Sequence, residues 1–367
     1  MMNICHDSTM TIEGKKNHYN VKFLKGYGHA ISVKNSKIIL KDNHDPFTPP
    51  VIESWYVKNM PYEKIVLQGK GYISTEALSL LSTHNRNLIL LDHHGKPVTY
   101  LNPVMESLTA TKYRMAQYDT FRDPEKCKYL SKQIVKAKLE SQIRFLRITQ
   151  RDEVKEAISK LESHLVNLDN ISTPIQNEAK TSHIYFRAFA KLIPERYEFH
   201  SRNQSQAGIL KNNATDIINA LLNYGYAVLA GEISKFINGF GLDAYYGFYH
   251  KSHTGFQPLV YDIMEPFRWL VDYTVFKIAN IKDHTQRIRL DEFAHTREGI
   301  IVMEYDLIRK FLELLERTFQ QDRRYEFRHG AKTRDGLKNV QEITVAKIMV
   351  QKLGEYCVGS RNNFNHS

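Results

Sequence analysis

The pattern of hydrophobic and polar residues changes near residue 100, and the change predicts two domains of different architecture. Before that point, from Val21 onward, the chain runs through short apolar segments separated by turn residues: VKFL, HAISV, KIILK, PVIESWYV, KIVLQ and NLILLD. Their β-branched and aromatic content is typical of strands. After Pro103 the apolar positions follow the helical period of about 3.6 residues. We therefore predict an α+β protein, with a strand-rich domain over residues 1–100 and an α-helical domain over 101–367.

Local signals subdivide the N-terminal domain. Residues 1–18 are polar and aperiodic, and we expect a flexible extension there. Asn35-Ser36 predicts a hairpin turn, and Ser74 or Thr75 predicts the cap of a short helix over 76–81. The run GKGYIST, which begins at Gly69, lacks the GxxxxGK[ST] spacing of a phosphate-binding loop. A tight turn between strands is the prediction for this run.

In the second domain the helical period and its punctuation predict a series of helices. Asp123-Pro124 is a cap followed by proline at the first helical position. The predicted helices cover residues 104–118, 124–149, 152–168, from 175 onward, 213–234, from 258 onward, 302–318 and 340–356.

The segment of residues 245–272 is the strongest candidate for chemistry. In the helix that begins at Gln257-Pro258, the polar positions 262, 265, 268 and 272 share one stripe. Asp262 and Glu265 therefore face the same way and repel each other unless a cation, a shared proton or a base such as Arg268 lies between them. His250 lies just upstream, so a His/carboxylate cluster that binds a hard divalent ion is one interpretation. A solvated helix face with a structural histidine is the alternative.

Pro266 lies inside this predicted helix. Proline lacks the N–H that would bond to the carbonyl of Asp262, so we expect a kink where the acids converge.

Other polar residues of the helical domain allow two interpretations each. Glu178 follows a helix start near Ile175, where a first-turn glutamate favours the helix dipole. Asn219 and Asn223 are four residues apart and share a face, which suits either structural hydrogen bonds or DNA contact. The basic and aromatic run at residues 321–334 is either a solvated surface or one that follows a nucleic-acid backbone; its arginines are Arg323, Arg324, Arg328 and Arg334.

Composition narrows the class of partner. The 367-residue chain is 42% hydrophobic, as in globular proteins, and has a formal net charge of +11. That charge favours a polyanion such as nucleic acid, with an acidic membrane surface as the rival. No apolar run approaches the roughly 18 residues needed to span a bilayer, and no signal-peptide pattern is present. Cys5, Cys127 and Cys357 are widely spaced, which predicts reduced thiols in a cytoplasm.

Several motifs together resemble the CRISPR-associated integrases, the family of CRISPR-associated protein one, which inserts new spacers into the repeat array. The resemblance extends through most of the chain. In the N-terminal domain, KGYGHAISVKNSKIILK and the run from KIVLQGKGY to HHGKP look like the dimerisation domain of the family. In the helical domain the matching pieces are Glu178 with Tyr185-Phe186, DIINA with Asn223-Tyr224, and GFYH followed by DIMEPFR.

The resemblance implies site residues. Glu178, His250 and Glu265 are the implied ligands of Mg²⁺ or Mn²⁺, and Asp262 is the neighbouring acid, in the second shell or at a second metal. His250 is preferred to His253 because it directly follows Gly-Phe-Tyr. The sequence departs from the family pattern at four positions: Asn177, Thr181, Ser182, and Glu265, where many members have aspartate. DNA contacts are implied for the helix of Asn219, Asn223 and Tyr224, and are suggested for Arg268 and the basic run.

The implied function is a metal-dependent DNA endonuclease and integrase of prokaryotic antiviral adaptation, which inserts spacer DNA by 3′-hydroxyl attack on a phosphodiester. The implied partners are double-stranded DNA and a second copy of the chain, with a small CRISPR-associated protein two bridging two dimers. The alternatives are a mobile-element integrase or DNA-repair nuclease of the same fold, and an inert DNA-binding scaffold. The joint presence of Glu178, His250 and Glu265 disfavours the scaffold.

Overall fold

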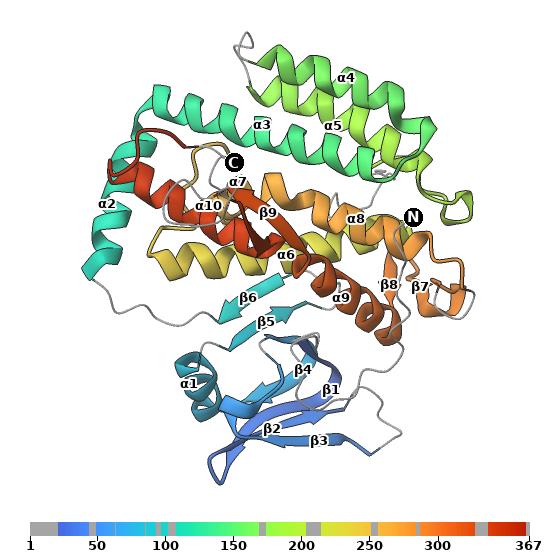
Figure 1. Cartoon of the computed structure of the whole chain (residues 1–367). Helices are drawn as coiled ribbons and strands as arrows, with labels where there is room; N and C mark the ends of the chain where they lie inside the picture. The colour runs from blue at the N-terminus through green and yellow to red at the C-terminus, as the bar shows by residue number, and fades with distance from the viewer. Residues whose placement is uncertain are drawn as a thin grey trace. The chain divides into compact units, whose positions relative to one another are not determined.

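A computed structural model describes the chain at residues 21–43, 49–62, 64–84, 86–92, 97–101, 108–168, 174–202, 214–250, 256–283, 287–326 and 337–364. The expected flexible extension at residues 1–18 lies outside these ranges, as do Cys5, His253, Arg328 and Arg334. Contacts divide the chain into two compact units, Met1–His93 with Val98–Leu101, and His94–Pro97 with Asn102–Ser367. The first unit is strand-rich and the second largely helical, which confirms the predicted α+β class (Figure 1).

The first unit is built on a mixed six-stranded sheet in the order β3-β2-β1-β4-β5-β6. Its elements are β1 (Val21–Lys34), β2 (Lys37–Asp42), β3 (Val51–Trp55), η1 (Val57–Asn59), β4 (Lys64–Ile73), α1 (Thr75–Thr83), β5 (Asn87–Leu91) and β6 (Pro97–Leu101). β1 pairs antiparallel with β2 and parallel with β4. Asn35 and Ser36 connect β1 to β2 with φ of 51° and 58°, which confirms the predicted hairpin turn.

Two predictions in this unit are wrong. The runs VKFL and HAISV belong to one continuous strand, β1, and Gly69-Lys70-Gly71 lies inside β4 rather than in a turn. The glycines are explained by the close approach of these two parallel strands. Gly69 has φ of +108°, and a Cβ there would lie 2.2 Å from the carbonyl oxygen of Gly26. Only glycine permits both that conformation and that contact.

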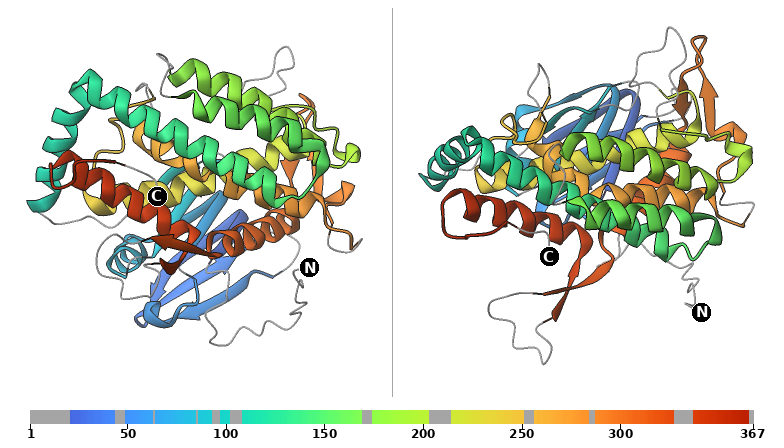
Figure 2. Two further views of the ribbon diagram at one scale, coloured as in Figure 1. Left: turned by 45° about the horizontal axis from the view of Figure 1, so that its top comes forward. Right: turned by 90° about the horizontal axis from the view of Figure 1, so that it is seen from above.

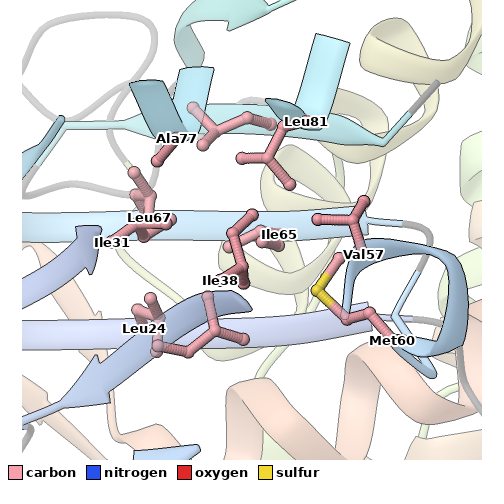
Figure 3. Close-up of a cluster of buried hydrophobic side chains, with 11 residues drawn as sticks. Leu24, Ile31, Ile38, Val57, Met60, Ile65, Leu67, Ala77 and Leu81 are labelled. Carbon is pink, nitrogen blue, oxygen red and sulfur yellow. The ribbon is translucent and has the colours of Figure 1, made fainter. Parts of the chain in front are cut away.

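Helix α1 covers the hydrophobic core of this unit. Ser74 caps it by accepting a hydrogen bond of 3.2 Å from Ala77 N, as predicted from the sequence. Ala77 and Leu81 are fully buried and point toward sheet side chains that include Ile65 and Leu67 (Figure 3).

The second unit contains most of the helices. They are α2 (Leu108–Arg122), α3 (Pro124–Ile148), η2 (Asp152–Val154), α4 (Lys155–Val166), α5 (Pro174–Lys191), η4 (Glu195–Tyr197), α6 (Ile217–Phe240), α7 (Pro258–Met264), η5 (Glu265–Phe267), α8 (Arg268–Ala279), η6 (Leu290–Glu292), α9 (Tyr305–Phe319) and α10 (Glu342–Cys357). Asp123 caps α3, and Asp216 caps α6. Helix α3 packs along α4 and α5, and α6 packs against α8 and α10 (Figures 1 and 2).

Two short hairpins interrupt the helical order that the sequence predicts for this unit. One joins β7 (Phe293–His295) to β8 (Ile301–Met303). The other joins β9 (Asp322–Glu326) to β10 (Leu337–Gln341), so the basic run begins as a strand and α10 begins at Glu342 instead of Val340. Strands of three to five residues leave too few alternating positions for the sequence to show their period.

Candidate metal and nucleic-acid site

A pocket of about 480 Å³ lies in the helical unit, where side chains from α3, α5, α6, η5 and α8 converge. Its acidic members are Glu178, Glu265 and Asp272, and His250 also lines it. Its basic members are Lys138, His183, Arg187, Arg202 and Arg268. The three side chains implied as metal ligands therefore line one pocket, although Glu178 is 72 positions upstream of His250.

Asp262 lies beside the pocket as a fully buried carboxylate that organises the segment before α7. Its Oδ2 accepts hydrogen bonds from the backbone N–H groups of Phe248 and Tyr249, at 2.8 and 3.1 Å. Its Oδ1 accepts the N–H of His250 at 2.9 Å and lies 2.7 Å from His250 Nδ1. The carboxylate is thus fully engaged. This geometry favours a positioning role for Asp262 over a second metal site.

The bond to Asp262 orients the imidazole of His250. Because a carboxylate oxygen accepts hydrogen bonds, Nδ1 carries the proton in the neutral imidazole, and Nε2 then has the lone pair. Nε2 lies 4.0 Å from Glu265 Oε1. Gly247 permits this approach, since a Cβ there would lie 2.7 Å from Asp262 Oδ2 and 2.8 Å from Pro258 Cβ. His250 thus directs its free nitrogen to the side on which Glu265 lies.

Glu265 lies where the helix changes character at Pro266. Helix α7 ends at Met264, a 3-10 turn covers Glu265–Phe267, and α8 begins at Arg268. The missing N–H of proline accounts for this interruption, as the sequence predicts. Arg268 Nε donates to Glu265 Oε1 at 2.9 Å, so Arg268 is a partner of Glu265, whereas Asp262 is engaged by His250 and backbone N–H groups. Burial favours the neutral acid, but Arg268 and Lys138 outweigh it and lower the pKa of Glu265 to about 2.

The solvated-face alternative for this stripe is wrong. Asp262, Glu265 and Asp272 are exposed by 0%, 4% and 1% respectively. Carboxylates buried to this degree need partners, and each of the three has them.

Glu178 projects from α5 toward α3. It is the fifth residue of α5, so it lies beyond the first turn in which the sequence places it. Its Oε1 accepts hydrogen bonds from Ser182 Oγ at 3.0 Å and from the ammonium of Lys138. Lys138 Nζ also lies 2.7 Å from Glu265 Oε2. The ammonium of Lys138 therefore bridges the two implied ligand carboxylates.

The donor set suits a hard divalent ion once this ammonium moves. Carboxylate oxygens and a neutral imidazole nitrogen are the ligands that Mg²⁺ and Mn²⁺ accept. The bridging ammonium indicates that the point between the carboxylates favours a cation. As the side chains stand, no group of three or more His, Cys, Asp and Glu residues in the described parts of the chain is close enough to hold an ion. Closing the ligand set around a metal requires Lys138 to withdraw.

The pocket also has basic side chains, among them Arg202. The guanidinium donates from Nη1 to Asn219 Oδ1 at 2.8 Å and from Nη2 to Asn223 Oδ1 at 2.7 Å. Asn219 also donates to the carbonyl of Ser201 at 3.0 Å. The amide pair therefore has a structural role, holding an arginine by neutral acceptors. Among the described residues, none forms an ion pair with Arg202.

Asp272 lines the same pocket as Arg202 and Arg268. It accepts hydrogen bonds from Tyr185 at 2.6 Å and Tyr226 at 2.5 Å, and both rings are buried. Burial raises the pKa of Asp272 to about 6 despite these bonds and the nearby charges of Arg268 and Arg202. Arg202 and Arg268 each lie over the ring of Tyr226, at 5.4 and 4.7 Å from its centroid.

Among the described residues, the remaining candidate DNA contacts, Tyr224, Arg323 and Arg324, do not line the pocket. Tyr224 is 2% exposed and packs against Phe311, so in this conformation it offers no surface to DNA, and we withdraw it. Arg323 lies 3.6 Å from Glu342 and faces it from β9. Arg324 is paired with Asn339 in the same hairpin. Both arginines stay DNA-binding predictions.

Sequence reasoning did not find Lys138, Arg202 or Asp272 as site residues. Lys138 is one of five lysines on α3, the others being Lys126, Lys128, Lys132 and Lys136, and the helical period alone does not single it out. Arg202 lies outside every predicted helix. Asp272 had a usable signal, because it shares the polar stripe with Asp262, Glu265 and Arg268.

The fold and the pocket define a class of protein: a mixed β-sheet unit followed by a largely helical unit in which buried carboxylates, a histidine and arginines meet. The family model described as CRISPR associated protein Cas1 matches residues 23–317, and the chain belongs to this family. It is similar to the CRISPR-associated endonuclease Cas1 1 of Archaeoglobus fulgidus, with 28% identity over 277 residues that cover 70% of this chain and 77% of that protein.

Solved structures share the fold. A casposase bound to integration product has a TM-score of 0.81 at 24% identity, over 94% of this chain and 92% of that one. A Cas1 protein from Thermotoga maritima has a TM-score of 0.72 at 17% identity, over 92% and 97%. A Cas6-RT-Cas1–Cas2 complex contains a chain that matches at a TM-score of 0.71 and 19% identity, over 96% of this chain and 37% of that one. The arrangement of sheet and helices is thus the Cas1 fold.

Within the described residues, no helix has both the length and the apolar content needed to cross a bilayer.

Proposed function

We propose that this protein is a metal-dependent DNA endonuclease and integrase that inserts spacer DNA into a CRISPR array. The observation that carries the proposal is the convergence of Glu178, His250 and Glu265 on one pocket that arginines also line. Family membership supports the same activity, since relatives in the Cas1 family are named endonucleases. A divalent ion and DNA phosphates are the ligands that match the acidic and the basic side chains of such a pocket.

The proposed reaction is a transesterification. The 3′-hydroxyl oxygen of the incoming DNA bonds to phosphorus in the repeat and loses its proton. The bond from that phosphorus to the 3′ oxygen of the target strand breaks, and this oxygen takes up a proton. Water replaces the 3′ hydroxyl when the enzyme hydrolyses DNA. When bound, Mg²⁺ or Mn²⁺ supplies Lewis-acid polarisation of the scissile phosphate.

The residues of the pocket divide the remaining work. Glu178, Glu265 and His250 Nε2 would hold the ion. Asp262 fixes the tautomer and the orientation of His250, and Arg268 orients Glu265 through its 2.9 Å bond. Arg202 and Arg268 bind the phosphates next to the reacting one, where their charge is partly desolvated and strengthens the contact.

Partners follow from the same proposal. The net charge of +11 supports double-stranded DNA as spacer precursor and as repeat array. Exposed apolar side chains on the first unit support a homodimer; they are Tyr27, Val51, Ile52, Tyr56 and Tyr72. The likeness to a chain of a Cas1–Cas2 complex supports a small Cas2-type protein that bridges two dimers. The cytoplasm of a prokaryotic cell is the proposed location.

A mobile-element integrase is the second candidate, and the fold match to a casposase favours it. The two candidates differ in the target that they select. An inert scaffold is disfavoured because Glu178, His250 and Glu265 line one pocket together.

A plasmid assay tests the function. We expect the protein, with its Cas2-type partner and Mg²⁺ or Mn²⁺, to join a short DNA duplex to a supercoiled plasmid that carries a repeat, and EDTA to abolish the joining. Insertion at the repeat supports CRISPR adaptation, whereas equal insertion into a plasmid without a repeat supports the mobile-element alternative. An absence of joining under every metal condition contradicts both.

A variant of Arg202 tests whether this arginine contacts a DNA phosphate. We expect Arg202→Met to weaken DNA binding about tenfold and to reduce the slope of log affinity against log salt by about one, because one phosphate contact is lost. Fluorescence anisotropy across a salt series measures both quantities.

The matched control for Arg202 is Arg297→Met, which removes the same charge from an exposed turn outside the pocket. Equal salt slopes for Arg202→Met and the unmodified protein contradict the phosphate contact.

A further inference from the structure

Lys138 is the one lysine that lines the pocket in the described part of the chain, and it is 7% exposed. Its ammonium contacts Glu178 Oε1 and lies 2.7 Å from Glu265 Oε2. Burying a lysine is costly unless its charge is paired. Here the cost of burying the lysine is offset, because its ammonium is paired with two carboxylates and relieves the repulsion between them.

The balance of charge sets a limit on metal binding. Glu178 and Glu265 carry two negative charges, and Lys138 with Arg268 carries two positive charges in direct contact with them. The four side chains together carry no net charge, so they attract a divalent ion only weakly, and the ammonium of Lys138 repels it. Affinity for the ion is therefore low while Lys138 stays in place, since its charge both occupies the position and repels a second cation.

Lysine is suited to leave, and Arg268 is not. The ammonium sits at the end of a flexible four-carbon stem and acts as a point charge, whereas a guanidinium is a rigid planar fork. Arg268 is also held against the ring of Tyr226 at 4.7 Å from the centroid. The stem of Lys138 projects from α3 into the same pocket of about 480 Å³, which gives the ammonium space to withdraw.

We propose that Lys138 is a tethered cation that exchanges with the divalent ion. Without metal it holds Glu178 and Glu265 together and keeps the pocket folded. As the ion binds between the carboxylates, the ammonium moves into the open pocket, where a DNA phosphate becomes its new partner. This inference rests on the proposed metal-dependent function. It makes Lys138 a positioning residue that prevents loss of the ligand arrangement in the absence of metal.

Metal binding without DNA tests the exchange. For the whole protein, titration calorimetry gives the affinity for Mn²⁺. Thermal unfolding in EDTA and in Mn²⁺ gives the melting temperature under each condition. Lys138→Met removes the competing charge and keeps the length of the stem. We expect this variant to bind Mn²⁺ at least about tenfold more tightly, to melt at a lower temperature in EDTA, and to gain more from Mn²⁺ than the unmodified protein does.

Lys138→Arg keeps the competing positive charge and makes it harder to displace. This variant also tests the exchange if Lys138→Met fails to fold. A guanidinium can bind both carboxylates at once and is harder to displace, so we expect weaker Mn²⁺ binding than in the unmodified protein. Lys136→Met, at an exposed position of α3, is the matched control and leaves the affinity unchanged.

The outcomes separate this inference from the function on which it rests. If the unmodified protein binds Mn²⁺, Glu178→Ala abolishes that binding, and both Lys138 variants bind as the unmodified protein does, the exchange is overturned and the metal site stands. If neither the unmodified protein nor Lys138→Met binds Mn²⁺, the metal site is overturned and the exchange with it. Tighter binding by the methionine variant together with weaker binding by the arginine variant supports the exchange.

Discussion

Glu178→Ala is expected to reduce strand transfer at least about 10³-fold while DNA affinity stays within about threefold of the unmodified protein. The substitution removes one of three donors for the ion, and a divalent ion held by the two that remain is poorly fixed. The arginines of the pocket, Arg202 and Arg268, are unchanged, so DNA still binds. The fold is expected to persist, because Lys138 keeps its 2.7 Å contact with Glu265. Strand transfer in the plasmid assay and anisotropy with the same duplex measure the two effects.

Two further variants sharpen this test. Glu178→Gln keeps the shape and the bond from Ser182 but lacks the charge, and it is expected to be as inactive as the alanine variant. Glu156→Ala removes a glutamate whose side chain is 75% exposed on α4, and it is expected to be fully active. Strand transfer by Glu178→Ala at the rate of the unmodified protein would remove Glu178 from the ligand set.

Asp262→Ala is expected to have the second large effect, on stability and on activity together. Loss of the carboxylate leaves the N–H groups of Phe248, Tyr249 and His250 without their acceptor. Unsatisfied groups of this kind cost about 3–5 kcal/mol in total, which lowers the melting temperature by about 5 °C in a protein of this size. Activity falls further because the imidazole of His250 loses its orientation and its tautomer. Calorimetry and single-turnover strand transfer measure these losses.

A double variant distinguishes a positioning role from direct ligation. If Asp262 acts only through His250, then His250→Ala combined with Asp262→Ala is no less active than His250→Ala alone. A further large loss in the double variant would indicate that Asp262 contacts the ion or the substrate itself. Asp291→Ala, at a carboxylate that is 73% exposed, serves as the control for charge loss.

Local chemistry made several elements predictable. Asn35 and Ser36 adopt the positive φ that their short polar side chains tolerate, and the Asp123 cap depends on backbone groups within three residues of it. Pro266 breaks the helix because its own ring removes the N–H. In each case the physical cause lies within one turn of the residue, so the sequence contains it.

The β1 glycines show where local reasoning fails. Gly26 and Gly28 have φ of 97° and 83°, and such residues usually mark turns. Here the strand continues through them because β4, some 40 residues onward, pairs with it on both sides of a β-bulge at Gly28. The pairing partner decides whether a glycine ends a strand or allows two strands to approach.

The site residues also divide into what the sequence identifies and what only the tertiary structure reveals. By resemblance to known integrases, the sequence identified Glu178, His250 and Glu265 as implied ligands, and by helical period it placed Asp262 beside Glu265. It did not reveal that Asp262 accepts from residues 248–250, or that Asn219 and Asn223 hold Arg202. Those contacts depend on how a loop approaches a helix, which local pattern does not encode.

The sequence by itself determined the α+β order, the change of period near residue 100 and the carboxylates and histidine available for a metal. The tertiary structure alone decided which of five lysines on α3 enters the pocket. It also decided that the polar stripe of α7 and α8 is buried, not solvated, because α3 packs against η5 and brings Lys138 over Glu265. Periodicity specifies which side chains share a face, and only the packing of helices distant in sequence specifies what that face meets.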